Sequence, residues 1–111
     1  MYLKAKLKIK KEKVSMKAVL IVHNTALDEE VNEALQSIGI NCYTKFTNAR
    51  GKGEISEPHL DTDVWPGTNY GTFVVTDQAK AKEIMDNVRR MREKLSSEGL
   101  KAFMWQIDEL T

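Results

Sequence analysis

The stretch KAVLIVHNTALDEEVNEALQSIGI, residues 17–40, contains in direct succession the signals of a strand, a helix and a helix end. Its start, KAVLIVH, is an apolar run of strand length that is rich in valine and isoleucine. The residues after it place apolar side chains on one helical face, at Leu27, Val31, Ala34, Leu35 and Ile38. We expect Thr25 and Asp28 to form a capping box at the start of this helix. Gly39 is expected to end it, because glycine accepts the left-handed conformation that closes many helices.

The next predicted strand is residues 40–48, INCYTKFTN, because tyrosine, phenylalanine and threonine favour extended backbone. Within this strand we expect Cys42 to be a buried packing residue and Tyr43 to belong to the strand. Cys42 is the one cysteine of the chain, so an internal disulfide bond is excluded and a reducing cytoplasm fits.

A second strand–helix–strand unit follows. YGTFVVT, residues 70–76, is the predicted third strand, Asp77 the N-cap of a helix that Gly99 ends, and LKAFMWQI, residues 100–107, the fourth strand. The second apolar stripe comprises Ala81, Ile84, Met85, Val88, Met91 and Leu95. Two such units predict an α+β, ferredoxin-like βαββαβ fold, an antiparallel four-stranded sheet with two helices on one face. Because the other face of the sheet needs a cover, we expect a dimer or trimer that packs these faces together.

The predicted domain is residues 16–111, and residues 1–15 form a basic N-terminal extension. The extension holds six lysines and one glutamate, a net charge of +5, which leaves −4 for the remainder because the whole chain carries +1. Its lysines alternate with Ala5, Leu7 and Ile9, a period of two that is typical of a strand. Three interpretations stay open: an added edge strand, a basic arm for an acidic partner, or a disordered extension upstream of the domain.

Composition excludes several classes of protein. The chain of 111 residues is 41% hydrophobic and 30% charged, with a mean hydropathy of −0.45, and no apolar run approaches the roughly 18 residues of a membrane span. No apolar segment follows the basic start, so we expect no signal peptide. The acidic balance of residues 16–111 and the lack of stacking aromatics argue against nucleic acid as a partner. The sequence therefore predicts a cytoplasmic protein without membrane insertion.

The connection between the second and third strands, ARGKGEISEPHLDTDVWPG at residues 49–67, is unusually long for a compact domain. At its start, Arg50, Gly51, Lys52 and Gly53 combine glycines that let backbone N–H groups approach an anion with two basic side chains. The interpretations are a site for a small anionic ligand or simply the start of a flexible loop.

His59, Asp61 and Asp63 would point the same way in an extended segment. One imidazole and two carboxylates suit a divalent transition metal, and the alternative is a solvated loop with an Asx turn. Trp65, before a Pro-Gly pair, is expected to anchor the connection on a neighbouring subunit or to receive a ligand ring. No nucleophile–base pair or close carboxylate pair is visible, so we do not expect an enzyme.

The segment VNEALQSIGINCYTKFTNARGKGE, residues 31–54, resembles the PII family of signalling proteins. Members typically have a Val-x-x-Ala-Leu helix, then Gly-Ile, a threonine-containing strand, and an Arg/Lys-Gly-x-Gly start of a long loop. The matching residues are Val31, Ala34, Leu35, Gly39, Ile40, Thr44, Arg50, Gly51 and Gly53. YGTFVVTDQAKAKEIMDNV resembles the family's third strand and second helix, and the resemblance covers roughly residues 16–110.

The resemblance implies a homotrimer with clefts between subunits and makes residues 49–67 similar to the family's T-loop, which moves with ligand state and contacts partner proteins. The implied ligand residues, for an adenine nucleotide in particular, are Thr44, Arg50, Gly51, Lys52, Gly53 and Asn69. The implied partner-binding residues are Glu54, Glu57, His59 and Trp65, and the partner would be a transporter, an enzyme or a regulator. The segment SSEG, residues 96–99, replaces the glycine-rich basic loop that other members use for ATP phosphates, and PHLDTDVWPGTN resembles a divergent PII-like branch.

An alternative follows from the CutA divalent-ion tolerance proteins, which share this trimeric plan. On that resemblance the protein would bind a divalent metal, or serve metal homeostasis, through His59, Asp61 and Asp63.

Overall fold

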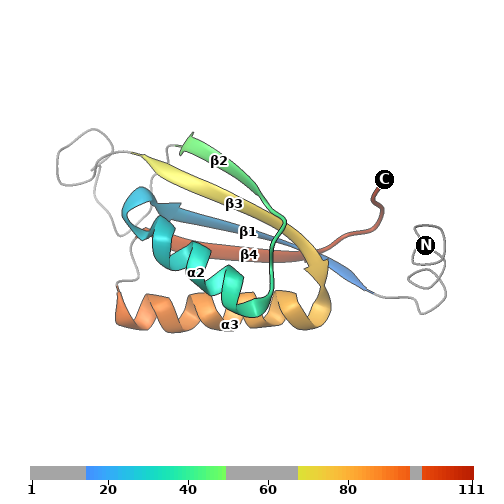
Figure 1. Cartoon of the computed structure of the whole chain (residues 1–111). Coiled ribbons are helices and arrows are strands. Elements are labelled where there is room, and N and C mark those ends of the chain that lie inside the picture. The colour runs from blue at the N-terminus through green and yellow to red at the C-terminus, as the bar shows by residue number, and fades with distance from the viewer. Residues whose placement is uncertain (1–14, 50–67, 96–98) are drawn as a thin grey trace.

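The computed structural model describes residues 15–49, 68–95 and 99–111 (Figure 1). The structure does not describe residues 1–14, 50–67 and 96–98. Of the basic extension it therefore includes only Ser15. The elements, in chain order, are β1 (Met16–Asn24), the 3-10 turn η1 (Thr25–Leu27), α2 (Asp28–Ile38), β2 (Thr44–Ala49), β3 (Asn69–Asp77), α3 (Gln78–Lys94) and β4 (Leu100–Gln106).

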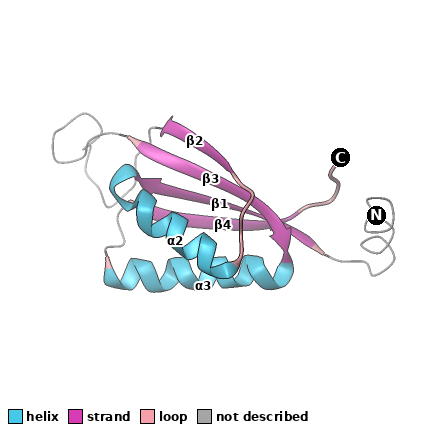
Figure 2. Cartoon of the chain, in the orientation of Figure 1, coloured by secondary structure: helices cyan, strands magenta, loops and turns pink. Residues whose placement is uncertain are grey.

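The strands form one antiparallel sheet in the order β2-β3-β1-β4 within the described residues. β1 pairs with β3 along its whole length and with β4 from Lys17 to His23. Both helices lie against the same face of this sheet (Figure 2). The predicted α+β ferredoxin-like fold, with two helices on one face of a four-stranded sheet, is confirmed.

The hydrophobic core lies between the helices and the sheet. It contains Val19, Ile21, Val31, Leu35, Ile40, Val74, Ala81, Ile84, Val88 and Leu100, with Leu27, Ile38, Met85 and Met91 packed at its margin. Both predicted apolar stripes therefore face the sheet, as the helical period requires. Leu95 is the exception: α3 ends at Lys94, and Leu95 is its exposed C-cap.

The prediction of a Thr25–Asp28 capping box is wrong. The side-chain oxygen of Asn24 accepts a hydrogen bond from the Ala26 backbone N–H at 2.8 Å, and a 3-10 turn precedes α2. Asparagine favours such local bonds to the backbone two residues on, so it takes the capping role before Thr25 can. Asp77 does cap α3, because its carboxylate accepts from the Lys80 N–H at 2.8 Å.

The second strand is shorter than predicted, since β2 begins at Thr44 and residues 40–43 are a connection. Gly39 ends α2 in the left-handed conformation at φ 91°, and the Ile40 N–H donates to the Leu35 carbonyl at 2.9 Å, which completes a Schellman end. Ile40 thereby enters the core, and the chain then crosses to the edge of the sheet. Cys42 and Tyr43 are consequently exposed and outside the strand, which corrects both predictions.

Candidate functional site

One end of the sheet holds both boundaries of residues 50–67 and the start of β4. Ala49, the last residue of β2, pairs with Asn69, the first of β3, so the two ends of residues 50–67 start side by side (Figure 1). The Asn24 N–H donates to the Gly99 carbonyl at 2.7 Å, which brings the start of β4 to the same end. A bulge interrupts β2 before Ala49, and Asn48 has a φ of 59°. β2 therefore changes direction just before the predicted ligand segment.

Of the predicted ligand residues, the structure describes only Thr44 and Asn69. Asn69 lies at the mouth of the connection, but Thr44 pairs with Phe73, four residues further along β3. At about 3.3 Å per residue, that separation is roughly 13 Å, so one subunit does not bring these two side chains together. Arg50, Gly51, Lys52 and Gly53 lie outside the described residues, as do Glu54, Glu57, His59, Asp61, Asp63 and Trp65. Their roles stay predictions.

A buried polar cluster, which the sequence pattern does not reveal, lies beside this end of the sheet. His23, on β1, has no exposed surface, and its Nε2 lies 3.2 Å from the Thr72 hydroxyl on β3. Its Nδ1 lies 3.2 Å from the Asn24 carbonyl oxygen, which can only accept, so Nδ1 carries the proton of the neutral ring. Nε2 then accepts from the Thr72 hydroxyl. The Tyr70 ring packs edge-on, with its centroid 5.9 Å from that of His23.

A salt bridge adjoins the histidine. Lys45 Nζ on β2 donates to Asp28 Oδ1 at 2.7 Å and to Asn32 Oδ1 at 2.9 Å, both on α2. Asn32 also donates to Asp28 Oδ2 at 3.3 Å, which closes a triangle of polar contacts. Asp28 Oδ1 lies 3.8 Å from His23 Nε2, so the carboxylate stands between the imidazole and the ammonium group.

The pKa of His23 lies below its ordinary value because burial removes the ring from water, the largest effect. The Asn24 carbonyl and the Asp28 carboxylate act in the opposite direction, and the charge of Lys45 lowers the pKa further. The sequence signal for this cluster was weak. His23 ends an otherwise apolar strand, and Lys45 alternates with Thr44 and Phe46 so that it faces the helices.

The helix-free face of the sheet is apolar and aromatic. The register places Leu20 beside both Phe73 and Phe103, and Phe46 beside Gly71. Trp105 lies across the same face, with its ring 6.1 Å from that of Phe73. The exposed large hydrophobic residues of this face are Phe46, Val75, Phe103 and Trp105, at 55%, 38%, 48% and 44%. Trp105 is therefore outside the core of a single chain.

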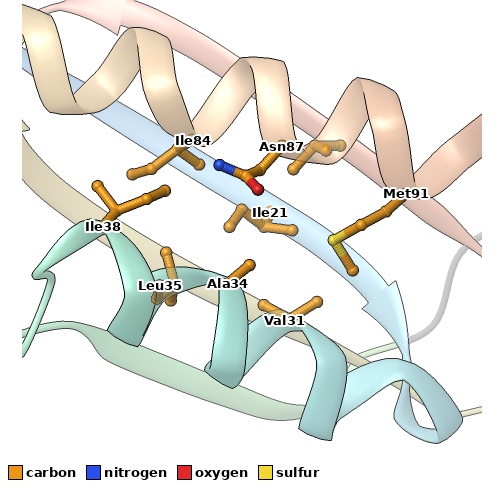
Figure 3. A pocket seen from close by; sticks show the side chains of 9 residues that line it. Ile21, Val31, Ala34, Leu35, Ile38, Ile84, Asn87 and Met91 are labelled. Atoms are coloured by element: carbon orange, nitrogen blue, oxygen red, sulfur yellow. The ribbon is translucent and has the colours of Figure 1, made fainter.

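The helix-covered face has a narrow groove between α2 and α3 (Figure 3). It is lined by Ile21, Val31, Ala34, Leu35, Ile38, Ile84, Asn87, Val88 and Met91. Its one polar side chain, Asn87, donates to the Glu83 carbonyl of its own helix. Among the described residues no charged group lines the groove, which is therefore a packing seam between the two helices.

The described part of the chain contains no group of three or more histidine, cysteine, aspartate or glutamate side chains placed to hold a metal ion. Over those same residues, no helix has the length and apolar character needed to cross a membrane.

The sequence profile of the family "Nitrogen regulatory protein P-II" matches residues 16–111. The chain therefore belongs to the PII family of regulatory proteins, as its sequence pattern predicted.

Solved structures agree with this assignment in their fold. CPII, a nitrogen regulatory PII-like protein from Thiomonas intermedia K12 bound to ADP, AMP and bicarbonate, has a TM-score of 0.67 at 19% identity over 84% of this chain and 86% of that one. Its apo form gives 0.64 at 16% over 84% and 89%. The GlnK–ATP complex of B. subtilis gives 0.61 at 20% over 85% of each chain. A comparison with curated proteins finds no significant match.

Proposed function

We propose that this protein is a non-enzymatic cytoplasmic regulator of the PII type. In this proposal a homotrimer binds a small anionic effector, an adenine nucleotide, in clefts between subunits. The effector changes the conformation of residues 49–67, and a partner protein, such as a transporter, an enzyme or another regulator, reads that change.

The observation that carries the proposal is that the exposed aromatic helix-free face includes side chains of β2 and β3. Phe46 and Phe73, which belong to this face, lie on the two strands that border residues 50–67. Monomeric proteins rarely leave a contiguous apolar patch of this kind uncovered. Packing these faces against one another would cover the patch and bring the border strands of different subunits together.

The position of Thr44 fits a site between subunits better than a site within one. Thr44 pairs with Phe73 and lies exposed at the margin of the aromatic face, roughly 13 Å from the mouth of the connection. In the proposed site, a ligand contacts Thr44 of one subunit and the Arg50–Gly53 segment of its neighbour. The ADP, AMP and ATP named for the solved structures of similar fold support an adenine nucleotide as the effector.

Native mass spectrometry of the full chain tests the assembly and the ligand together, with ATP, ADP and AMP added in turn. The expected result is a trimer that gains nucleotide. The double variant Arg50→Ala, Lys52→Ala should then weaken nucleotide binding at least tenfold in titration calorimetry, because it removes both basic side chains of the predicted nest. Lys82→Ala, a change of an exposed lysine on α3, is the control. A monomer, or a trimer whose affinity is the same in the double variant, would overturn the proposal.

A further inference from the structure

We propose that His23, Asp28 and Lys45 form a proton-sensitive clamp: protonation of His23 releases Lys45 from Asp28 and loosens β2, the strand that leads into residues 50–67. The proposal rests on the proposed function only for its consequence, since the coupling is measured without nucleotide or partner. Its failure would leave the trimer and ligand binding untouched.

The charges of the cluster balance only while His23 is neutral. Asp28 carries one negative charge and Lys45 one positive charge, and the neutral imidazole lies on the other side of the carboxylate. Tyr70 is the other titratable group that faces the ring, and Thr72 and Asn32 complete the polar surroundings among the described residues. A proton on Nε2 therefore gives the cluster a net charge of +1, with two cations beside one carboxylate.

The proton also breaks the present hydrogen-bond pattern. Neutral Nε2 accepts from the Thr72 hydroxyl, but protonated Nε2 must donate. Its available acceptors are the Thr72 oxygen, after the hydroxyl turns, and Asp28 Oδ1 at 3.8 Å. A short movement of the Asp28 side chain closes that distance to a charge-assisted bond.

Exposure decides which cation leaves. The His23 side chain is 0% exposed and is fixed by β1, whereas the Lys45 side chain is 20% exposed and ends a long flexible stem. The ammonium group can move into water at little cost, but the imidazolium cannot. Protonation should therefore displace Lys45.

Loss of this contact matters to β2 because the strand has few other attachments. Among the described residues β2 is an edge strand, paired with β3 from Thr44 to Phe46 and again at Ala49 after the bulge. Lys45 ties it to α2 through Asp28 and Asn32. With the tie released, the backbone of Thr44–Ala49 is expected to open more often.

The test is an NMR titration of the full chain between pH 8 and 5. The imidazole signals report the pKa of His23, and those of the other histidine are identified with His59→Asn. We expect the amide signals of Thr44–Ala49 to shift with the same midpoint as His23, and we expect this component to vanish in His23→Gln. The proposal is overturned if the amide signals of β2 do not shift as His23 titrates. It is also overturned if these signals shift with the same midpoint in His23→Gln.

Lys45→Met provides a second test that does not need the histidine variant to fold. Removal of the ammonium group frees Asp28 for the imidazolium and removes a repelling charge, so the pKa of His23 should rise. Lys17→Met removes the lysine that bonds Gln106 at the opposite end of the sheet, and it should leave the pKa of His23 unchanged. An unchanged pKa in Lys45→Met, or equal shifts in both variants, would contradict the clamp.

Discussion

Replacement of Phe103 by aspartate is expected to dissociate the proposed trimer without unfolding the subunit. Phe103 lies on β4 beside Leu20 and is 48% exposed, so about half of its surface is free to be buried by another subunit. Full burial of a phenylalanine contributes roughly 1.5–3 kcal/mol, so the free half contributes about 1 kcal/mol per subunit. The buried aspartate adds a penalty of at least about 1 kcal/mol per subunit for an unpaired polar group.

For three subunits the loss is therefore about 6 kcal/mol, since each loses about 2 kcal/mol. At 1.4 kcal/mol per tenfold change, the trimer association constant should fall by about four orders of magnitude. Within a single chain the other half of the side chain is already buried, so by the same scale the free energy of unfolding should fall by about 1 kcal/mol, which leaves the subunit folded.

Sedimentation velocity over a dilution series measures the association state, and circular dichroism checks that the subunit stays folded. Leu95→Asp is the matched control, because Leu95 is 45% exposed at the end of α3 and away from the helix-free face. The proposed interface is refuted if Phe103→Asp associates as strongly as the unaltered chain, or if Leu95→Asp dissociates to the same extent as Phe103→Asp.

The remaining predictions concern the folded subunit. In urea unfolding, the free energy of unfolding should fall as the pH drops below about 6.5. The reason is that burial lowers the pKa of His23 in the folded chain, so the unfolded chain binds the proton at a higher pH. The prediction is contradicted if the free energy of unfolding of the unaltered chain has the same pH dependence as that of His23→Gln. Ile84→Ala should cost about 2–5 kcal/mol in the same assay, since Ile84 is 1% exposed in the core, and a loss below about 1 kcal/mol would be inconsistent with that packing. Gly39→Ala should cost about 1 kcal/mol because φ is 91° and the added Cβ meets only Lys80 Nζ at 3.7 Å, so the effect is backbone strain. Asp77→Ala should cost about 1 kcal/mol through loss of the α3 cap, and Asp86→Ala, an exposed change within α3, should cost less.

The parts of the fold that the sequence predicted well depend on short-range patterns. Both apolar stripes, the left-handed Gly39 and the Asp77 cap follow from periodicity and backbone preference over one or two helical turns. The same patterns failed where a neighbouring group competed. Asn24, not Thr25, forms the capping hydrogen bond before α2. The Schellman end of α2 includes Ile40, a residue that strand propensity had assigned to the second strand.

The polar cluster was not predictable because its members are far apart in the sequence. His23, Lys45 and Thr72 come from three strands, and only the register brings them together. A histidine at the end of an apolar strand gives no sign of its partners. Residues 50–67 pose the opposite case: composition singles them out, but the roles proposed for them would depend on other subunits and on ligands.

β2 is the element through which the proposed ligand and the proposed clamp would act on one another. Lys45 precedes the Arg50–Gly53 segment by five residues along an edge strand that has few attachments. A ligand that holds this strand in place would favour the Lys45–Asp28 contact and so disfavour the proton on His23. Because such coupling is reciprocal, a proton on His23 would weaken ligand binding by the same factor. The sensitivity of the protein to pH and its sensitivity to the effector would then be one property of β2, fixed by a single lysine.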